Sequence, residues 1–264
     1  MVLERLVSVR EAVREPAWMF VIGGIIATVC LLISFLIFPS SVGLMTTFLV
    51  TMASMPFMLN LASYEEAREE QTVRDVEITS SFEIHKPIIK IYIAFFGGMI
   101  FAFSIIFMIL PENIVFKLFE DQINEIRIIR GEFLGLGHFG TILVNNIGVL
   151  FITFLFSFLF GAGAVFILTW NASVLATAIG LSAKSLGGIH ALPMAVLTYF
   201  PHGSLELLAY FIGGIAGSLV SVALSKRRTR RLNLIIKDSS YLMIIAIVFL
   251  IIAAFIESVS LSLA

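Results

Sequence analysis

Long apolar runs alternate with shorter polar segments along this chain. A run of about 20 apolar residues is long enough to cross the roughly 30 Å hydrocarbon core of a bilayer as a helix. Full spans are predicted at residues 17–38, 42–61, 88–110, 141–160, 165–181 and 241–261. The alternation therefore predicts an all-α fold, a polytopic membrane helix bundle that forms one membrane domain over residues 1–264.

The apolar stretch 189–224 is ambiguous, because it is too long for one span and short for two. It contains Pro193, Pro201 and Gly203, residue types that interrupt helices. We expect a re-entrant half-helix at 189–200, followed by a full span. The prediction is then about seven transmembrane spans plus one re-entrant half-helix. Such a half-helix is tolerated only where its free backbone groups face protein or a watery cavity.

The polar segments differ from one another in character. Residues 1–16 form a charged amphipathic segment without the apolar core and cleavage pattern of a secretory signal. Residues 62–87 are polar on all faces, which is typical of a solvated loop or a helical hairpin. Within residues 111–140, apolar and charged residues recur on opposite sides at helical spacing. This pattern predicts an amphipathic helix that lies on the membrane surface.

The distribution of lysine and arginine predicts the topology, because these residues collect in cytoplasmic loops near the ends of spans. With the half-helix in place, nearly all basic residues share one side of the membrane. The other side keeps only Lys117, Arg127, Arg130 and Lys184. We therefore expect the N-terminus and the loop 62–87 inside, the helix within 111–140 outside, and the C-terminus outside after a last span in 239–264. The basic inside loop 226–238 is typical of a membrane anchor or, alternatively, of a site for anionic lipid head groups.

Composition agrees with the apolar pattern and excludes other classes of protein. The chain is 59% hydrophobic and 13% charged, well above the apolar share of about 45–50% in soluble domains. Its net charge of -1 argues against nucleic acid as a partner. The single cysteine, Cys30, lies in an apolar run and cannot form a disulfide within one chain. We therefore predict that the chain lies in the lipid bilayer of the cytoplasmic membrane of a prokaryote.

A histidine and a glutamate stand out within the apolar sequence YFPHGSLELL. On a helix that begins at Pro201, His202 and Glu206 lie one turn apart on one face. Gly213 follows Glu206 by almost two turns, and with Gly217 it forms the small-residue spacing of closely packed membrane helices. The polar pair is therefore expected to face the bundle. The pair is either a functional site or a structural contact that holds the bundle together.

Other polar residues at membrane depth are candidates for the same cluster. They are Asn145 and Asn146 in the fourth span, Asn171 in the fifth, His190 in the expected half-helix and His138 before the fourth span. We expect them to line one polar cavity with His202 and Glu206 near the outer face. Each asparagine alone is more typical of an inter-helix hydrogen bond. Glu257, near the outer end of the last span, is expected to reach water.

Motifs of known enzymes give little support to a catalytic function. Histidine and carboxylate suit zinc, but His-x-x-x-Glu is a weak pattern and a metal is left unassigned. No His-Glu-x-x-His, Gly-x-Ser-x-Gly or phosphate-binding glycine loop is present. Residues Glu69 to Arg74 match the EExxxR signature of the CAAX-protease-like family, but they lie in a hydrophilic segment, so we attribute the match to chance. We predict no catalytic residue and no cofactor.

The segment 141–225 resembles the stage II sporulation protein M family of multi-pass membrane proteins. The resemblance rests on PHGSLE at 201–206 and the small-residue span AYFIGGIAGSL, with weaker similarity in TWNASVLATAIGLSA and VNNIGVLFITFLFSFLFGAGA. It implies that His202 and Glu206 are important, with Pro201, Gly203, Gly213 and Gly217 as the structural motif. It also implies a role in organising peptidoglycan-degrading partners rather than in catalysis. Asn171 is followed by Ala172, where the family has glycine.

These observations predict a non-enzymatic scaffold or assembly factor in the cell membrane. Membrane or cytoplasmic proteins would bind the charged inside segment, and the sequence is compatible with an oligomer. The alternative is a transporter or channel for a small solute or ion that uses His202 and Glu206. A membrane metalloenzyme is the third hypothesis.

Overall fold

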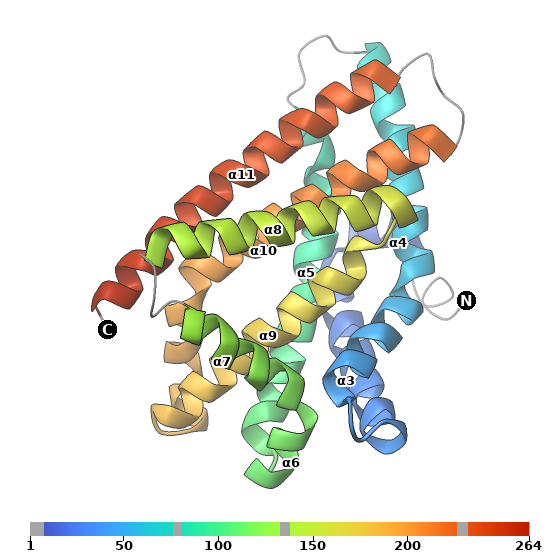
Figure 1. Cartoon of the computed structure of the whole chain (residues 1–264). Helices are drawn as coiled ribbons and strands as arrows, with labels where there is room; N and C mark the ends of the chain where they lie inside the picture. The colour runs from blue at the N-terminus through green and yellow to red at the C-terminus, as the bar shows by residue number, and fades with distance from the viewer. Residues whose placement is uncertain (1–7, 76–80, 133–137, 226–231, 264) are drawn as a thin grey trace.

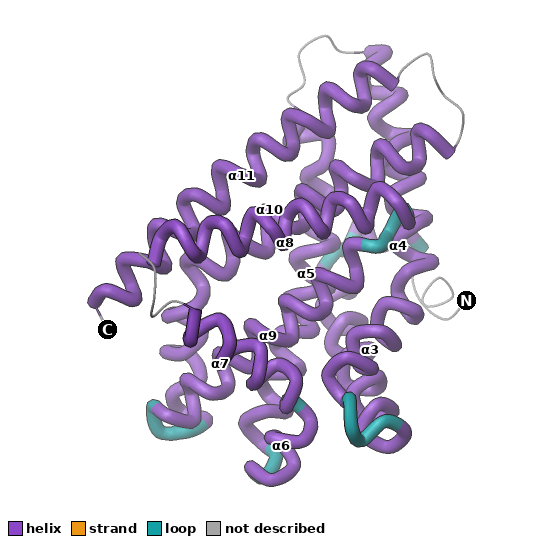
Figure 2. The backbone as a smooth tube through the Cα atoms, viewed as in Figure 1, coloured by secondary structure: helices purple, strands orange, loops and turns teal. Residues whose placement is uncertain are grey.

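The described part of the chain is helical throughout. In the computed structural model it comprises residues 8–75, 81–132, 138–225 and 232–263, without the side chains of 65–75, 81–84, 129–132, 138 and 262–263. The helices are α2 (Val9–Arg14), α3 (Ala17–Ile37), α4 (Val42–Asp75), α5 (Ser81–Ile109), α6 (Glu112–Leu118), α7 (Glu120–Glu132), α8 (His138–Phe160), α9 (Ala164–Ser185), the 3-10 turn η1 (Ile189–Ala191), α10 (Leu192–Ser225) and α11 (Leu232–Leu263). No strand occurs in these residues, and the connections among them that the structure describes are short loops (Figure 2).

Within the described residues, seven helices are long and apolar enough to cross a membrane: α3, α4, α5, α8, α9, α10 and α11. This confirms the predicted polytopic helical bundle. In Figure 1, α3, α4 and α5 run roughly from top to bottom, and α8 and α11 cross them obliquely. The central helix is α10, which packs against α8, α9 and α11. Its residues from Ala209 to Leu219 are all buried, so the core follows this helix.

The structure differs from the expected half-helix before Pro201. Residues 189–191 form η1, and α10 continues from Leu192 through Pro201 to Ser225 without a break. A proline removes one backbone hydrogen bond and bends a helix, but in a membrane the remaining backbone bonds favour continuing the helix. In Figure 1, α10 rises from the lower left and then turns toward the upper right. Its 34 residues reach about 51 Å, longer than a bilayer core, which explains the ambiguous length of this apolar stretch.

The amphipathic segment after Pro111 forms two helices, α6 and α7, instead of one. Their apolar side chains pack on the bundle: Phe119 contacts the rings of Phe103 and Phe107 on α5. Gln122 on α7 is buried and donates a hydrogen bond to Ser173 on α9, at 3.1 Å. The apolar stripe predicted from the sequence is therefore present, but it covers protein.

The charged segment 62–87 is largely helical, because α4 and α5 extend into it. Helix α4 continues to Asp75 and α5 begins at Ser81, well beyond the apolar parts of both helices, Val42–Tyr64 and His85–Ile109. Of the two structures that the sequence allowed, a helical hairpin agrees with these bounds. In the same way α11 begins at Leu232, so the end of the predicted basic loop is helical.

Candidate functional site

A cavity of about 220 Å³ lies where α8, α9, α10 and α11 meet. Ile126 of α7 also reaches it. The polar side chains of its lining are Asn145, Asn146, Asn171, Tyr199, His202, Glu206, Tyr210 and Glu257. The rest of the lining is apolar, for example Ile142, Leu175 and Leu207. The cavity therefore combines a small number of polar groups with an otherwise apolar wall, as ligand sites commonly do.

Glu206 is the centre of the hydrogen bonds at this cavity. The Nδ2 of Asn146, on α8, donates to Oε1 of Glu206 at 2.8 Å, and Asn145 donates to Oδ1 of Asn146 at 3.3 Å. The carboxyl groups of Glu206 and Glu257 are in hydrogen-bonding contact. A hydrogen bond between two carboxyl groups requires a proton on one of them. The site thus joins side chains of three helices, and its two glutamates are placed so that they can share a proton.

His202 lies one turn before Glu206 and lines the same cavity. Its side chain is only 8% exposed, and its Nδ1 has no hydrogen-bond partner among the described residues. The ring of Tyr199 lies beside it, with 5.8 Å between ring centroids. Glu206 is hydrogen-bonded to Asn146 and Glu257. His202 and Glu206 therefore share the cavity but do not form the simple pair that the sequence allowed.

The other three predicted members of the cluster have different positions. Asn171 lines the cavity, but its Nδ2 donates to the carbonyl oxygen of Ile167 on its own helix, at 2.8 Å. His190 is exposed in η1 and is not among the residues that line the cavity. His138 begins α8, and its side chain lies outside the described part of the chain. The structure therefore brings Asn145, Asn146, His202 and Glu206 together and leaves His190 out.

The glycines of α10 explain how α8 comes close enough to supply Asn146. A side chain at Gly213 would collide with Leu150, and one at Gly217 would collide with the backbone of Phe154 and with Ser157. Along α8, Asn146, Leu150 and Phe154 lie against successive residues of α10, namely Glu206, Gly213 and Gly217. The order is the same on both helices, so α8 and α10 run in the same direction. Gly203 lies against Leu175 of α9 in a similar way, and Pro201 itself is exposed. Small residues on one face of α10 thus set the position of the site.

Glu257 belongs to the cavity, whereas its position near the end of the last span suggested contact with water. The sequence did contain a signal for this contact. Within the expected spans, a polar residue lies a few residues from the outer end in three cases: Asn146, Glu206 and Glu257. Polar groups at one depth on neighbouring helices can meet. The contact between Glu206 and Glu257 could not be predicted, because the sequence does not show which helices are neighbours.

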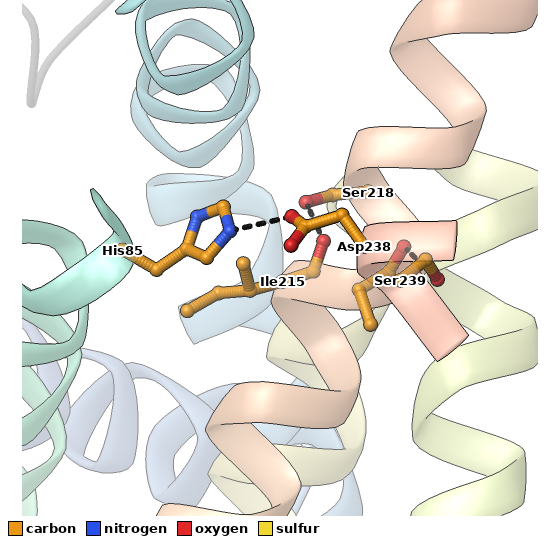
Figure 3. A network of polar contacts seen from close by, with 6 residues as sticks. His85, Ile215, Ser218, Asp238 and Ser239 are labelled. Carbon is orange, nitrogen blue, oxygen red and sulfur yellow. Dashed lines mark hydrogen bonds and ion pairs between the residues drawn. The ribbon is translucent and has the colours of Figure 1, made fainter. Parts of the chain in front are cut away.

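A second polar contact, at the other end of α10 and α11, was not predicted. The Nε2 of His85 on α5 lies 2.9 Å from Oδ2 of Asp238 on α11 (Figure 3). The side chain of His85 is fully buried, and that of Asp238 is 13% exposed. Nearby, Ser239 donates to the carbonyl oxygen of Ala216 on α10, and Ser218 donates to that of Ile215. His85 belonged to the polar segment 62–87 in the sequence, and nothing there indicated a partner more than 150 residues away.

The chemistry of the cavity favours protons and cations over a bound metal. Within the described residues, no group of three or more His, Cys, Asp or Glu side chains could hold a metal ion. Two carboxyl groups in contact can instead share a proton, or release it when a cation takes its place. The cavity is thus suited to holding a proton or a positively charged group.

Comparison with known proteins gives one match. The family model described as "Stage II sporulation protein M" matches residues 17–260. The match covers nearly the whole chain, more than the C-terminal half in which the sequence motifs were noted. No curated protein and no solved structure matches the chain.

Proposed function

The chain belongs to the stage II sporulation protein M family, and we propose that it acts as a non-enzymatic scaffold or assembly factor in a cell membrane. The observation that carries this proposal is that polar side chains bond across helices. Asn146 of α8 bonds to Glu206 of α10, and His85 of α5 contacts Asp238 of α11. Such bonds hold membrane helices in one arrangement. A fixed bundle suits a scaffold, whose docking surfaces must keep their geometry.

The partner surface in this proposal is the helical hairpin formed by the end of α4 and the start of α5. Both helices extend past their apolar parts, which end at Tyr64 and begin at His85. The segment between them is rich in acidic and basic residues. The charged sequence of this segment offers protein partners a polar surface.

Partner capture in native membranes tests the scaffold role. The chain is cross-linked in membranes, purified, and its partners are identified by mass spectrometry. Charge reversal at Glu65, Glu66, Glu69 and Glu70 should remove the captured partners, and charge reversal at Glu120 on α7 is the matched control. If both variants capture the same partners as the wild type, the hairpin is not the partner surface.

We also propose that the chain lies in the cytoplasmic membrane with its N-terminus inside and its C-terminus outside. One crossing by α10 replaces the expected half-helix and span, so the basic residues 226–231 stay on the same side as the N-terminus. In a Cys30→Ser background, Ser40→Cys should react with an impermeant maleimide added to intact cells, and Thr229→Cys should not. Labelling of Thr229→Cys alone would reverse the orientation.

A transporter or channel is the second candidate, favoured by the cavity itself. It places two glutamates in contact beside His202, whose Nδ1 has no hydrogen-bond partner among the described residues. Flux in proteoliposomes separates the two functions. A transporter should lose flux in Glu206→Gln while the protein remains folded, whereas a scaffold should show no flux in the wild type.

A further inference from the structure

The two glutamates in the cavity between α8, α9, α10 and α11 have more acceptor atoms than hydrogen-bond donors that reach them. The carboxyl groups of Glu206 and Glu257 together have four oxygen atoms, each able to accept. The donors that reach them are the Nδ2 of Asn146 and the proton between the two carboxyl groups. Both glutamates line the cavity, so we expect their remaining acceptor capacity to be available to a ligand there. A ligand that matches this site must therefore donate hydrogen bonds.

His202 provides an independent indication that something binds here. His202 lines the cavity and is more than nine-tenths buried, and its Nδ1 has no hydrogen-bond partner among the described residues. A buried polar atom left without a hydrogen bond is costly, and native structures rarely keep one without a bound group to satisfy it. In the neutral ring, Nδ1 can act as one more acceptor.

The size and the walls of the cavity select the class of ligand. Its volume of about 220 Å³ is several times the roughly 30 Å³ that a water molecule occupies, so it admits a molecule of several heavy atoms. The rings of Tyr199 and Tyr210 line it and favour a positive charge. Ile142, Leu175 and Leu207 supply an apolar wall for a short carbon chain.

We propose that this cavity binds a small primary ammonium ion, with its N–H groups directed at Glu206, Glu257 and His202 and its alkyl chain against the apolar wall. The site does not depend on whether the chain is a scaffold or a transporter. A scaffold would be regulated by the bound ion, and a transporter would move it.

Binding exchanges a proton for the ammonium ion. Before binding, the two carboxyl groups share one proton between them. The incoming R–NH₃⁺ takes the place of this proton and leaves both groups as carboxylates. The displaced proton passes to water. The net charge of the site is therefore unchanged. The other titratable side chains of the lining are His202, Tyr199 and Tyr210, and α7, α8 and α9 contribute none. The predicted exchange therefore belongs to the glutamate pair.

Titration calorimetry on the full chain in detergent tests the proposal, with n-butylammonium chloride as the probe. Heats measured in two buffers of different ionisation enthalpy should show that about one proton is released per bound ion. Tetramethylammonium has the charge but no N–H group, and it should bind the wild type at least about tenfold more weakly. This comparison needs no variant.

Variants then assign the binding to the carboxyl pair. Glu257→Gln and Glu206→Gln should each weaken n-butylammonium binding at least about tenfold and abolish proton release. His190→Ala is the control, because His190 is exposed in η1 and is not among the residues that line the cavity, and it should leave binding unchanged. No binding by the wild type, equal binding of tetramethylammonium or of sodium, or unchanged binding in both folded glutamine variants would each overturn the proposal.

Discussion

Two polar clusters share helix α11, and they differ in whether their polar groups have partners within the fold. The paired cluster consists of His85 and Asp238, whose side chains contact each other in a buried position. The cavity cluster consists of Asn146, His202, Glu206 and Glu257 around an open space. On α11, Asp238 and Glu257 are about 28 Å apart along the helix axis. Helix α11 thus carries a closed polar contact near its start and an open one near its end.

The two clusters differ in whether their polar groups have partners, and this difference distinguishes a stabilising contact from a binding site. In the paired cluster, histidine and aspartate share a hydrogen bond across two helices, as expected of a contact that stabilises the fold. In the cavity cluster, two acids face each other, and a histidine nitrogen is left without a partner among the described residues. The same residue types therefore indicate structure where they are satisfied and a ligand where they are not.

The largest expected effect is the loss of the paired cluster. His85→Ala leaves Asp238 in a largely buried position without its partner, which should lower the free energy of unfolding by about 3 kcal/mol. Reversible unfolding in mixed detergent and denaturant measures this. His190→Ala, at an exposed histidine, should change the stability by less than about 0.5 kcal/mol. If His85→Ala and His190→Ala had equal effects, the contact of His85 with Asp238 would not stabilise the fold.

A bulky residue at the close approach of α8 and α10 should have the next largest effect. Gly217→Val places a side chain against the backbone of Phe154 and should cost about 1–3 kcal/mol of unfolding free energy. Because α8 carries Asn146, it should also weaken the contact to Glu206. Gly148→Ala on α8 is the control, since nothing lies near that position and the change should stabilise the helix by about 0.4–1 kcal/mol. A neutral Gly217→Val would mean that α8 and α10 are not closely packed.

Substitutions in the cavity cluster should affect stability less than those in the paired cluster. Asn146→Leu removes one inter-helix hydrogen bond to Glu206, and we expect a loss of about 1 kcal/mol. The exposed neighbour, Asn145→Leu, should cost less than about 0.5 kcal/mol in the same unfolding measurement. If Asn146→Leu destabilised as much as His85→Ala, the cavity cluster would be mainly structural.

The smallest effect is expected for Asn171. Its amide bonds to Ile167 on the same helix, so Asn171→Ala should change the unfolding free energy by less than about 0.5 kcal/mol. A loss comparable to that of Asn146→Leu would show that Asn171 supports Glu206, as the sequence suggested.

The apolar pattern predicted the helices well, because a span reveals itself by length and composition alone. It misjudged α10, since a proline in a water-soluble helix ends it, whereas a proline in a membrane helix bends it. The pattern also placed His202, Glu206, Asn145 and Asn146 near one another, because each lies near the outer end of a span. It could not find the contacts of Glu257 or of His85 with Asp238, because these depend on which helices are neighbours.

The most direct test of the difference between the two clusters is labelling of the full chain in membranes with dicyclohexylcarbodiimide, followed by peptide mass spectrometry. This apolar reagent adds to carboxyl groups that carry a proton and that it can reach. Glu206 or Glu257 should be modified, n-butylammonium should protect the modified residue, and Asp238 should stay unmodified. Modification of Asp238 with none at Glu206 or Glu257 would contradict the assignment of an open, proton-sharing site to the cavity.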